Sequence, residues 1–168
     1  MKSRTFRLLI LTSVALLGAV LFAAATEAAT IVALGASNTY GKGVARDQAY
    51  PAQLEAILRA RGKNVNVVNA GINGDTTEGM LQRLDSAVPD GVRAVILQPG
   101  GNDRRKGSPD RTADIAKRLA ARHIAVIMLP NGMLRGLPHQ PDGQHLTPEG
   151  YRMLAQSVAA RVAGAVGR

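Results

Sequence analysis

Short aliphatic runs alternate with segments of helical periodicity along most of this chain, and this alternation limits its fold more than any other feature. The runs predict four buried strands, at 30–34, 65–69, 93–98 and 124–129. Strands that are almost continuously apolar are typical of a parallel sheet covered by helices on both faces. With right-handed crossovers, we predict an α/β fold, a flavodoxin-like three-layer α/β/α sandwich with a mainly parallel sheet of four or five strands.

The helices of this pattern carry recognisable end signals. A periodic segment over 49–61 predicts the first helix. The next is predicted to open with a capping box made by Asp75 and Glu78. Two later helices are predicted from a capping residue followed by proline, at Ser108-Pro109 and at Thr147-Pro148. The Pro- and Gly-rich stretch between them, 130–146, predicts a long loop.

The first residues have the pattern of an export signal. Three basic residues precede an uncharged run, 8–25, and small residues follow it. We predict a signal peptide over 1–28, cleaved after Ala25 or Ala28, and a single domain over 29–168. The protein would then be periplasmic or secreted. An uncleaved membrane anchor formed by residues 8–25 is the alternative.

Composition excludes several classes of function. The 168-residue chain has no cysteine, which removes disulfides, thiolate catalysis and cysteine zinc sites. Its formal net charge is +9, but the basic residues are scattered and the run at 104–106 is short. Three tyrosines are a poor supply of stacking platforms, so we expect no nucleic-acid partner. The glycines near 35–43 do not have the spacing of a phosphate-binding loop.

Polar residues suited to acyl transfer follow the predicted strands. Ligands bind at the carboxyl ends of parallel strands, and Ser37 lies just after the first one. A serine nucleophile needs a base that a third group orients, and Asp142 and His145 stand three residues apart in the late loop. Gly74 can offer an unobstructed backbone N–H and Asn102 a side-chain amide to a developing oxyanion, and both follow neighbouring strands.

Four segments together resemble the sequence blocks of the SGNH hydrolases, also called the GDSL esterase/lipase family. The motif style is similar to that of bacterial thioesterase/lysophospholipase members, and the resemblance spans 30–166. The blocks are Gly35-Ala36-Ser37, the segment from Asn69 to Thr76 with Gly74, Gly100-Gly101-Asn102-Asp103, and Asp142-Gly143-Gln144-His145.

The resemblance implies a role for each motif residue. Ser37 would be the nucleophile and would lend its backbone N–H to the oxyanion hole, which Gly74 and Asn102 complete. His145 would be the base and Asp142 its orienting partner. The implied activity is hydrolysis of carboxylic esters or thioesters through an acyl-enzyme, without metal or cofactor. The implied substrate is a small-molecule, lipid or carbohydrate ester, and the protein could associate with a membrane surface.

Two other functions fit the same fold. One is a catalytically inactive SGNH-fold module that binds envelope carbohydrate or lipid, and the other is a nucleotide-binding flavodoxin-like domain.

The sequence also departs from the family pattern. Ala36 replaces the usual aspartate, and only 38 residues separate Asp103 from Asp142, so we expect a trimmed chain with a shallow acyl pocket. Arg104, Arg105 and Lys106 are expected to form a solvated basic face, and attraction of anionic substrates is the alternative.

Overall fold

The computed structural model describes residues 27–167. The predicted signal peptide lies almost wholly outside the described residues, and the alternative anchor, 8–25, lies entirely outside them. Within 27–167, no helix combines the length and the apolar character that crossing a bilayer requires.

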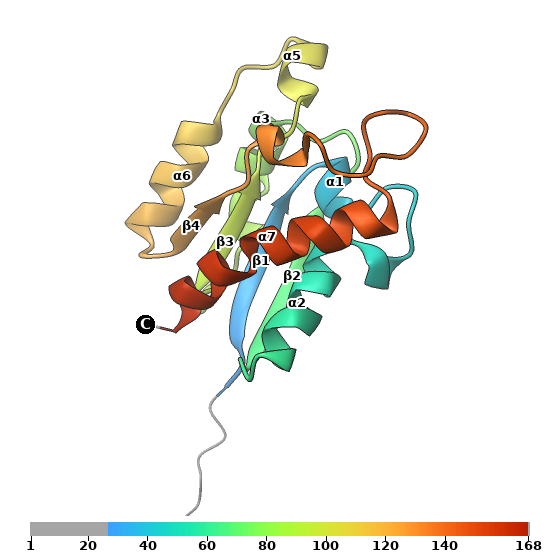
Figure 1. Cartoon of the computed structure of the whole chain (residues 1–168). Coiled ribbons are helices and arrows are strands. Elements are labelled where there is room, and N and C mark those ends of the chain that lie inside the picture. Colours follow the sequence, from blue (N-terminus) through green and yellow to red (C-terminus); the bar gives the residue numbers. More distant parts are fainter. Residues whose placement is uncertain (1–26, 168) are drawn as a thin grey trace, which may run out of the picture.

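The centre of the molecule is a parallel sheet of four strands, as the alternation predicted (Figure 1). The spatial order is β2-β1-β3-β4, with bounds β1 Ala29–Gly35, β2 Val65–Gly71, β3 Ala94–Gln98 and β4 Ala125–Met128. Gly35, the last residue of β1, lies level with Gly71 of β2 and with Gln98 of β3. The loops that follow these three strands therefore leave the sheet at one edge and at one height.

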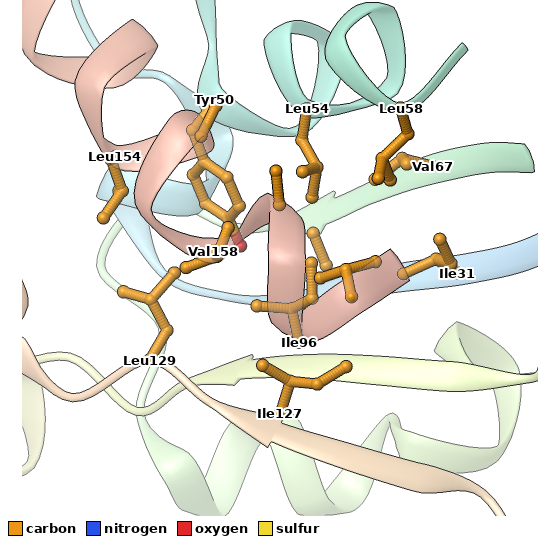
Figure 2. Close-up of a cluster of buried hydrophobic side chains, with 14 of the residues drawn as sticks. Ile31, Tyr50, Leu54, Leu58, Val67, Ile96, Ile127, Leu129, Leu154 and Val158 are labelled. Atoms are coloured by element: carbon orange, nitrogen blue, oxygen red, sulfur yellow. The ribbon is translucent and has the colours of Figure 1, made fainter. Parts of the chain in front are cut away.

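Helices cover both faces of the sheet, which gives the expected three layers (Figure 1). One face is covered by α2 (Tyr50–Ala60) and α7 (Pro148–Val166), and the other by α3 (Thr77–Gln82), α4 (Leu84–Ala87) and α6 (Thr112–Ala121). Each face of the sheet has its own hydrophobic core, and alternate β1 residues pack into one or the other. Ile31 packs on the α2/α7 side and Val32 on the opposite side. Figure 2 shows the first of these cores, in which Tyr50 and Val158 meet the sheet.

The remaining elements lie in loops. They are α1 (Ser37–Tyr40), α5 (Asn102–Lys106) and the two 3₁₀ helices η1 (Arg46–Gln48) and η2 (Asn131–Leu134). The predicted long loop over 130–146 is therefore partly ordered: it contains η2, and His139 forms an isolated antiparallel bridge with Leu146.

The predicted capping box at Asp75 and Glu78 is wrong. The N-cap of α3 is Thr76, whose side chain accepts a hydrogen bond from the Gly79 N–H at 3.1 Å. The Asp75 carboxylate instead pairs with Arg83 at 2.8 Å. Arg83 also donates to the carbonyls of Gly35 and Ala70, so this pair ties α3 to the ends of β1 and β2.

The predicted start of the third helix at Ser108-Pro109 is also wrong, since α6 begins at Thr112. The preceding segment is held by long-range contacts instead. The Arg111 N–H donates to Thr77 Oγ1 at 2.7 Å, and Ser108 Oγ donates to Glu78. At Thr147 the same sequence signal is confirmed, because its side chain accepts from the Gly150 N–H at 3.1 Å and Pro148 opens α7.

Candidate active site

The carboxyl edge of the sheet gathers all the residues singled out in the sequence. Ser37 begins α1 directly after β1, Gly74 lies in the loop after β2, and Asn102 begins α5 after β3. Asp142 and His145 come from the loop before α7. Ser37, Gly74, Asn102, Asp142 and His145 line one cavity of about 300 Å³.

A tight bend positions Ser37. The turn from β1 into α1 brings Thr39 against Gly35, so that a Cβ on Gly35 would lie 2.1 Å from Thr39 Oγ1. Only glycine fits there. Ala36, at the position where the family pattern usually has aspartate, is the N-cap of α1, is 3% exposed and packs in the second core. The bend is therefore held without a side-chain cap.

Ser37, His145 and Asp142 form a continuous hydrogen-bonded chain. Ser37 Oγ lies 2.9 Å from His145 Nε2, and His145 Nδ1 lies 2.5 Å from Asp142 Oδ2. The hydrogen bond with His145, and then those from the backbone N–H groups of His145 and Gln144, hold the pKa of Asp142 well below its usual range. Asp142 is thus an acceptor only, which places a hydrogen on Nδ1 and leaves Nε2 free to accept the Ser37 proton.

Three N–H groups are available around the same cavity. Ser37 is the first residue of a helix, so its N–H has no intrahelical acceptor. Gly74 adopts a positive φ of 74° and its carbonyl accepts from Lys106 Nζ at 2.6 Å. The Asn102 amide donates one hydrogen to the Asp75 carbonyl at 2.7 Å and keeps the other. Within 27–167, no direct hydrogen bond joins Asn102 to Ser37.

Asn38 links the turn that carries Ser37 to the loop that carries His145, a role that the sequence analysis missed. Its Nδ2 donates to the Gln144 carbonyl at 3.0 Å, and its Oδ1 accepts from the Tyr151 hydroxyl at 3.1 Å. Burial raises the pKa of Tyr151 to about 12, so the hydroxyl remains a donor at neutral pH. Only its position directly after Ser37 could have drawn attention to Asn38.

A second chain of polar side chains supports the other side of the site. Thr39 Oγ1 donates to Gln98 Oε1 at 3.1 Å, and Gln98 Nε2 donates to Asn131 Oδ1 at 3.0 Å. Thr39 and Gln98 are almost completely buried. The chain connects α1 with the end of β3 and with η2, and no motif marks these residues in the sequence.

The predicted basic face at 104–106 is exposed, and two of its three residues also make contacts that hold the site together. The Arg105 guanidinium donates to Asn102 Oδ1 and to Gln144 Oε1, which joins α5 to the histidine loop. Lys106 holds the Gly74 carbonyl. Their sequence position directly after the third block was the available signal.

Comparison with known proteins decides the family. Residues 33–165 match the model of the GDSL-like lipase/acylhydrolase family. The chain belongs to this family. It is 31% identical over 119 residues to esterase TesA of Pseudomonas aeruginosa, a match that covers 67% of this chain and 59% of that protein. It is 32% identical over 115 residues to an arylesterase of Vibrio mimicus, covering 62% and 56%.

Solved structures show the same fold. A crystal structure of TesA matches with a TM-score of 0.72 at 23% identity, covering 81% of this chain and 99% of that one. AlinE4, an SGNH-hydrolase family esterase, matches with a TM-score of 0.56 at 27% identity, covering 82% and 74%. The chain spans somewhat more than half the length of the first two curated relatives.

Proposed function

We propose that the protein is a serine hydrolase that cleaves carboxylic esters or thioesters through an acyl-enzyme. The observation that carries this proposal is the continuous chain from Ser37 Oγ through His145 to Asp142 at the carboxyl edge of the sheet. Such a chain activates a hydroxyl that is otherwise a weak nucleophile. Two of the relatives are named esterase TesA and arylesterase, which supports the same reaction class.

The geometry supports each step of this reaction. His145 Nε2 takes the Ser37 proton as Oγ attacks the carbonyl carbon, and Asp142 stabilises the imidazolium. The tetrahedral oxyanion is bound by the N–H groups of Ser37 and Gly74 and by the free amide hydrogen of Asn102. His145 then protonates the departing alcohol or thiol, leaving Ser37 acylated. A water molecule deacylates the enzyme by the same steps, with His145 as the base.

An ester panel tests this function. Hydrolysis of 4-nitrophenyl and thioester substrates is measured for residues 29–168 and for Ser37→Ala, with Ser86→Ala as a control at an exposed serine of α4. We expect turnover that Ser37→Ala abolishes and Ser86→Ala preserves. Absence of turnover together with tight binding of an envelope carbohydrate or lipid would replace the hydrolase by an inactive binding module.

We also propose that residues 1–28 are an export signal and that 29–168 acts as one domain in the periplasm or outside the cell. The basic start and the uncharged run 8–25 support this. N-terminal sequencing of the exported protein should find a start at residue 26 or 29. An intact Met1 in the membrane fraction would contradict it and favour the anchor.

A further inference from the structure

A second, larger cavity extends from Ser37 in the direction of η2. Its volume is about 450 Å³, which suits a small ligand. Ser37, Asn102 and His145 form one wall, and the segment from Asn131 to His139 forms another. A substrate whose carbonyl sits at Ser37 therefore places its neighbouring atoms in this space.

Arginines give this cavity its charge. Arg104, Arg105 and Arg135 line it, and within the described residues 27–167 it is lined by no aspartate or glutamate. The structure gives Arg104 and Arg135 no ion pair or hydrogen bond with any described side chain. Other arginines of the molecule do pair with carboxylates, namely Arg59, Arg83, Arg111, Arg118, Arg122 and Arg152.

Few apolar side chains line the same cavity. Ala36 and Leu134 supply its only aliphatic side chains among the described lining residues, while Asn38, Gln98 and Asn131 contribute amides. A long hydrocarbon chain would therefore gain little binding free energy from contact with these walls. Unpaired guanidinium groups in a concave site instead concentrate anions, and each can bind a carboxylate or phosphate through two parallel hydrogen bonds.

We infer that the natural substrate is a short ester or thioester that carries a carboxylate or phosphate group, which Arg104 and Arg135 bind. This inference rests on the proposed hydrolase function and names its substrate class. Arg105 adds positive charge at the same wall, although its guanidinium is already committed to Asn102 and Gln144.

Matched pairs of esters test the inference. For a charge on the alcohol side, 4-acetoxybenzoate is compared with its neutral methyl ester, and 4-acetoxyphenyl phosphate supplies the phosphate arm. For a charge on the acyl side, monomethyl adipate is compared with dimethyl adipate. The quantity measured is the ratio of kcat/KM for the charged ester to that for its neutral partner, so intrinsic reactivity cancels when variants are compared.

The ratio is measured for the parent protein, for the double variant Arg104→Gln/Arg135→Gln and for Arg61→Gln. Arg61 is an exposed C-cap of α2 next to the amino end of β2, away from the site, and its replacement removes one charge at a distance. We expect the double variant to lower the ratio by about tenfold or more in at least one arm, the loss of one charge-assisted hydrogen bond. Arg61→Gln should leave it unchanged.

The ester pair whose kcat/KM ratio falls in the double variant identifies whether the bound anion is a carboxylate or a phosphate. It also identifies on which side of the ester bond the anion lies. A ratio that the double variant leaves unchanged in every arm, while neutral esters are still hydrolysed, would overturn the inference and leave the hydrolase function standing.

Binding decides the inference even if no ester is turned over. The charged esters of all three arms and their neutral partners are titrated into Ser37→Ala by NMR, with and without the two arginine substitutions. In at least one arm we expect tighter binding of the anion, weakened about tenfold by the substitutions and by raised salt. Equal affinities of the charged and neutral esters in every arm, or binding insensitive to the arginines, would overturn it.

Discussion

At Asn102, the role of an oxyanion donor is hardest to distinguish from that of a structural turn residue. The residue is 4% exposed and lines the cavity of Ser37, and its amide donates to the Asp75 carbonyl. We predict that Asn102→Ala lowers kcat by about 10²–10³ with little change in KM, because the lost hydrogen bond forms only with the tetrahedral oxyanion. Steady-state kinetics on an activated ester measures both constants.

Asp103 provides the matched control next to it. Its carboxylate accepts from the Thr77 N–H and from Thr77 Oγ1, both at 2.8 Å, and so fastens α5 to α3. Asp103→Ala should lower the melting temperature while kcat of the folded protein stays near normal. The reverse pattern, with Asn102→Ala melting early yet turning over normally, would make Asn102 a turn residue.

Asp142 stays ionised over the pH range in which activity would be measured. Hydrogen bonds from His145 and Gln144 lower its pKa, so the stability it contributes is full above its ordinary pKa near 4 and is lost only as pH falls through the lowered value. Its protonation therefore cannot produce an acid limb in the pH range where imidazoles titrate. An acid limb of kcat/KM in that pH range therefore reports protonation of the general base.

We predict that Asp142→Asn lowers kcat on the order of 10³–10⁴, because the amide no longer holds the imidazole in the tautomer whose Nε2 accepts the serine proton. Steady-state kinetics of both proteins measures this loss. A profile of the parent protein that is flat from about pH 5 to 8 would exclude a histidine base.

At the residue scale, the sequence was enough to predict which candidate residues meet at one edge of the sheet, and not which residues hold them there. The candidates are Ser37, Gly74 and Asn102 after the strands, and Asp142 and His145 in the loop before α7. Asn38, Gln98 and Arg105 act through contacts with residues distant in the chain, such as the 106-residue separation between Asn38 and Gln144. Only folding creates such contacts.

Among the elements, α7 shows how local signals succeed where nothing competes with them. Thr147 caps the helix, and Pro148 fits its first position, where no hydrogen bond is lost. At Ser108-Pro109 the same signal failed because Thr77 hydrogen-bonds Arg111 and holds the segment outside the helix. At Asp75 the carboxylate pairs with Arg83 and accepts from the Thr76 N–H, while Thr76 is the residue that caps the helix. Tertiary partners thus outweighed local propensity at both positions.

We predict that Thr147→Ala lowers the free energy of unfolding by about 1 kcal/mol, because the Gly150 N–H loses its acceptor. Urea denaturation followed by circular dichroism measures the change. Ser157→Ala, inside the same helix, should be neutral or slightly stabilising, since alanine has the higher helix propensity. Equal destabilisation by both substitutions would show that the cap contributes nothing.

For the whole molecule, the alternation of strands and helices was sufficient to predict the sheet and its layers. The site at one edge follows from parallel topology, because consecutive strands end at the same level. The walls of the larger cavity could not be predicted, since they come from η2 and the loop after it, whose path no periodicity encodes. The trimmed segment between Asp103 and Asp142 still provides one side of that cavity.

The polar walls predict a preference for short acyl groups. Burying one methylene in apolar surroundings gains about 0.8 kcal/mol, or roughly fourfold in affinity. With Ala36 and Leu134 as the aliphatic lining, kcat/KM should stop rising beyond about four carbons. A 4-nitrophenyl ester series from acetate to dodecanoate, kept below micellar concentrations, measures this. A steady rise to the longest chain would contradict it.

The central claim is that Ser37 is a nucleophile activated by His145 in this folded chain. A fluorophosphonate probe tests it most directly, because it reacts with an activated serine whatever the natural substrate. Intact-mass spectrometry should find one adduct per chain, peptide mapping should place it on Ser37, and Ser37→Ala and His145→Ala should both abolish or strongly slow it. An unlabelled protein, or an adduct on another residue that persists in Ser37→Ala, would contradict the account.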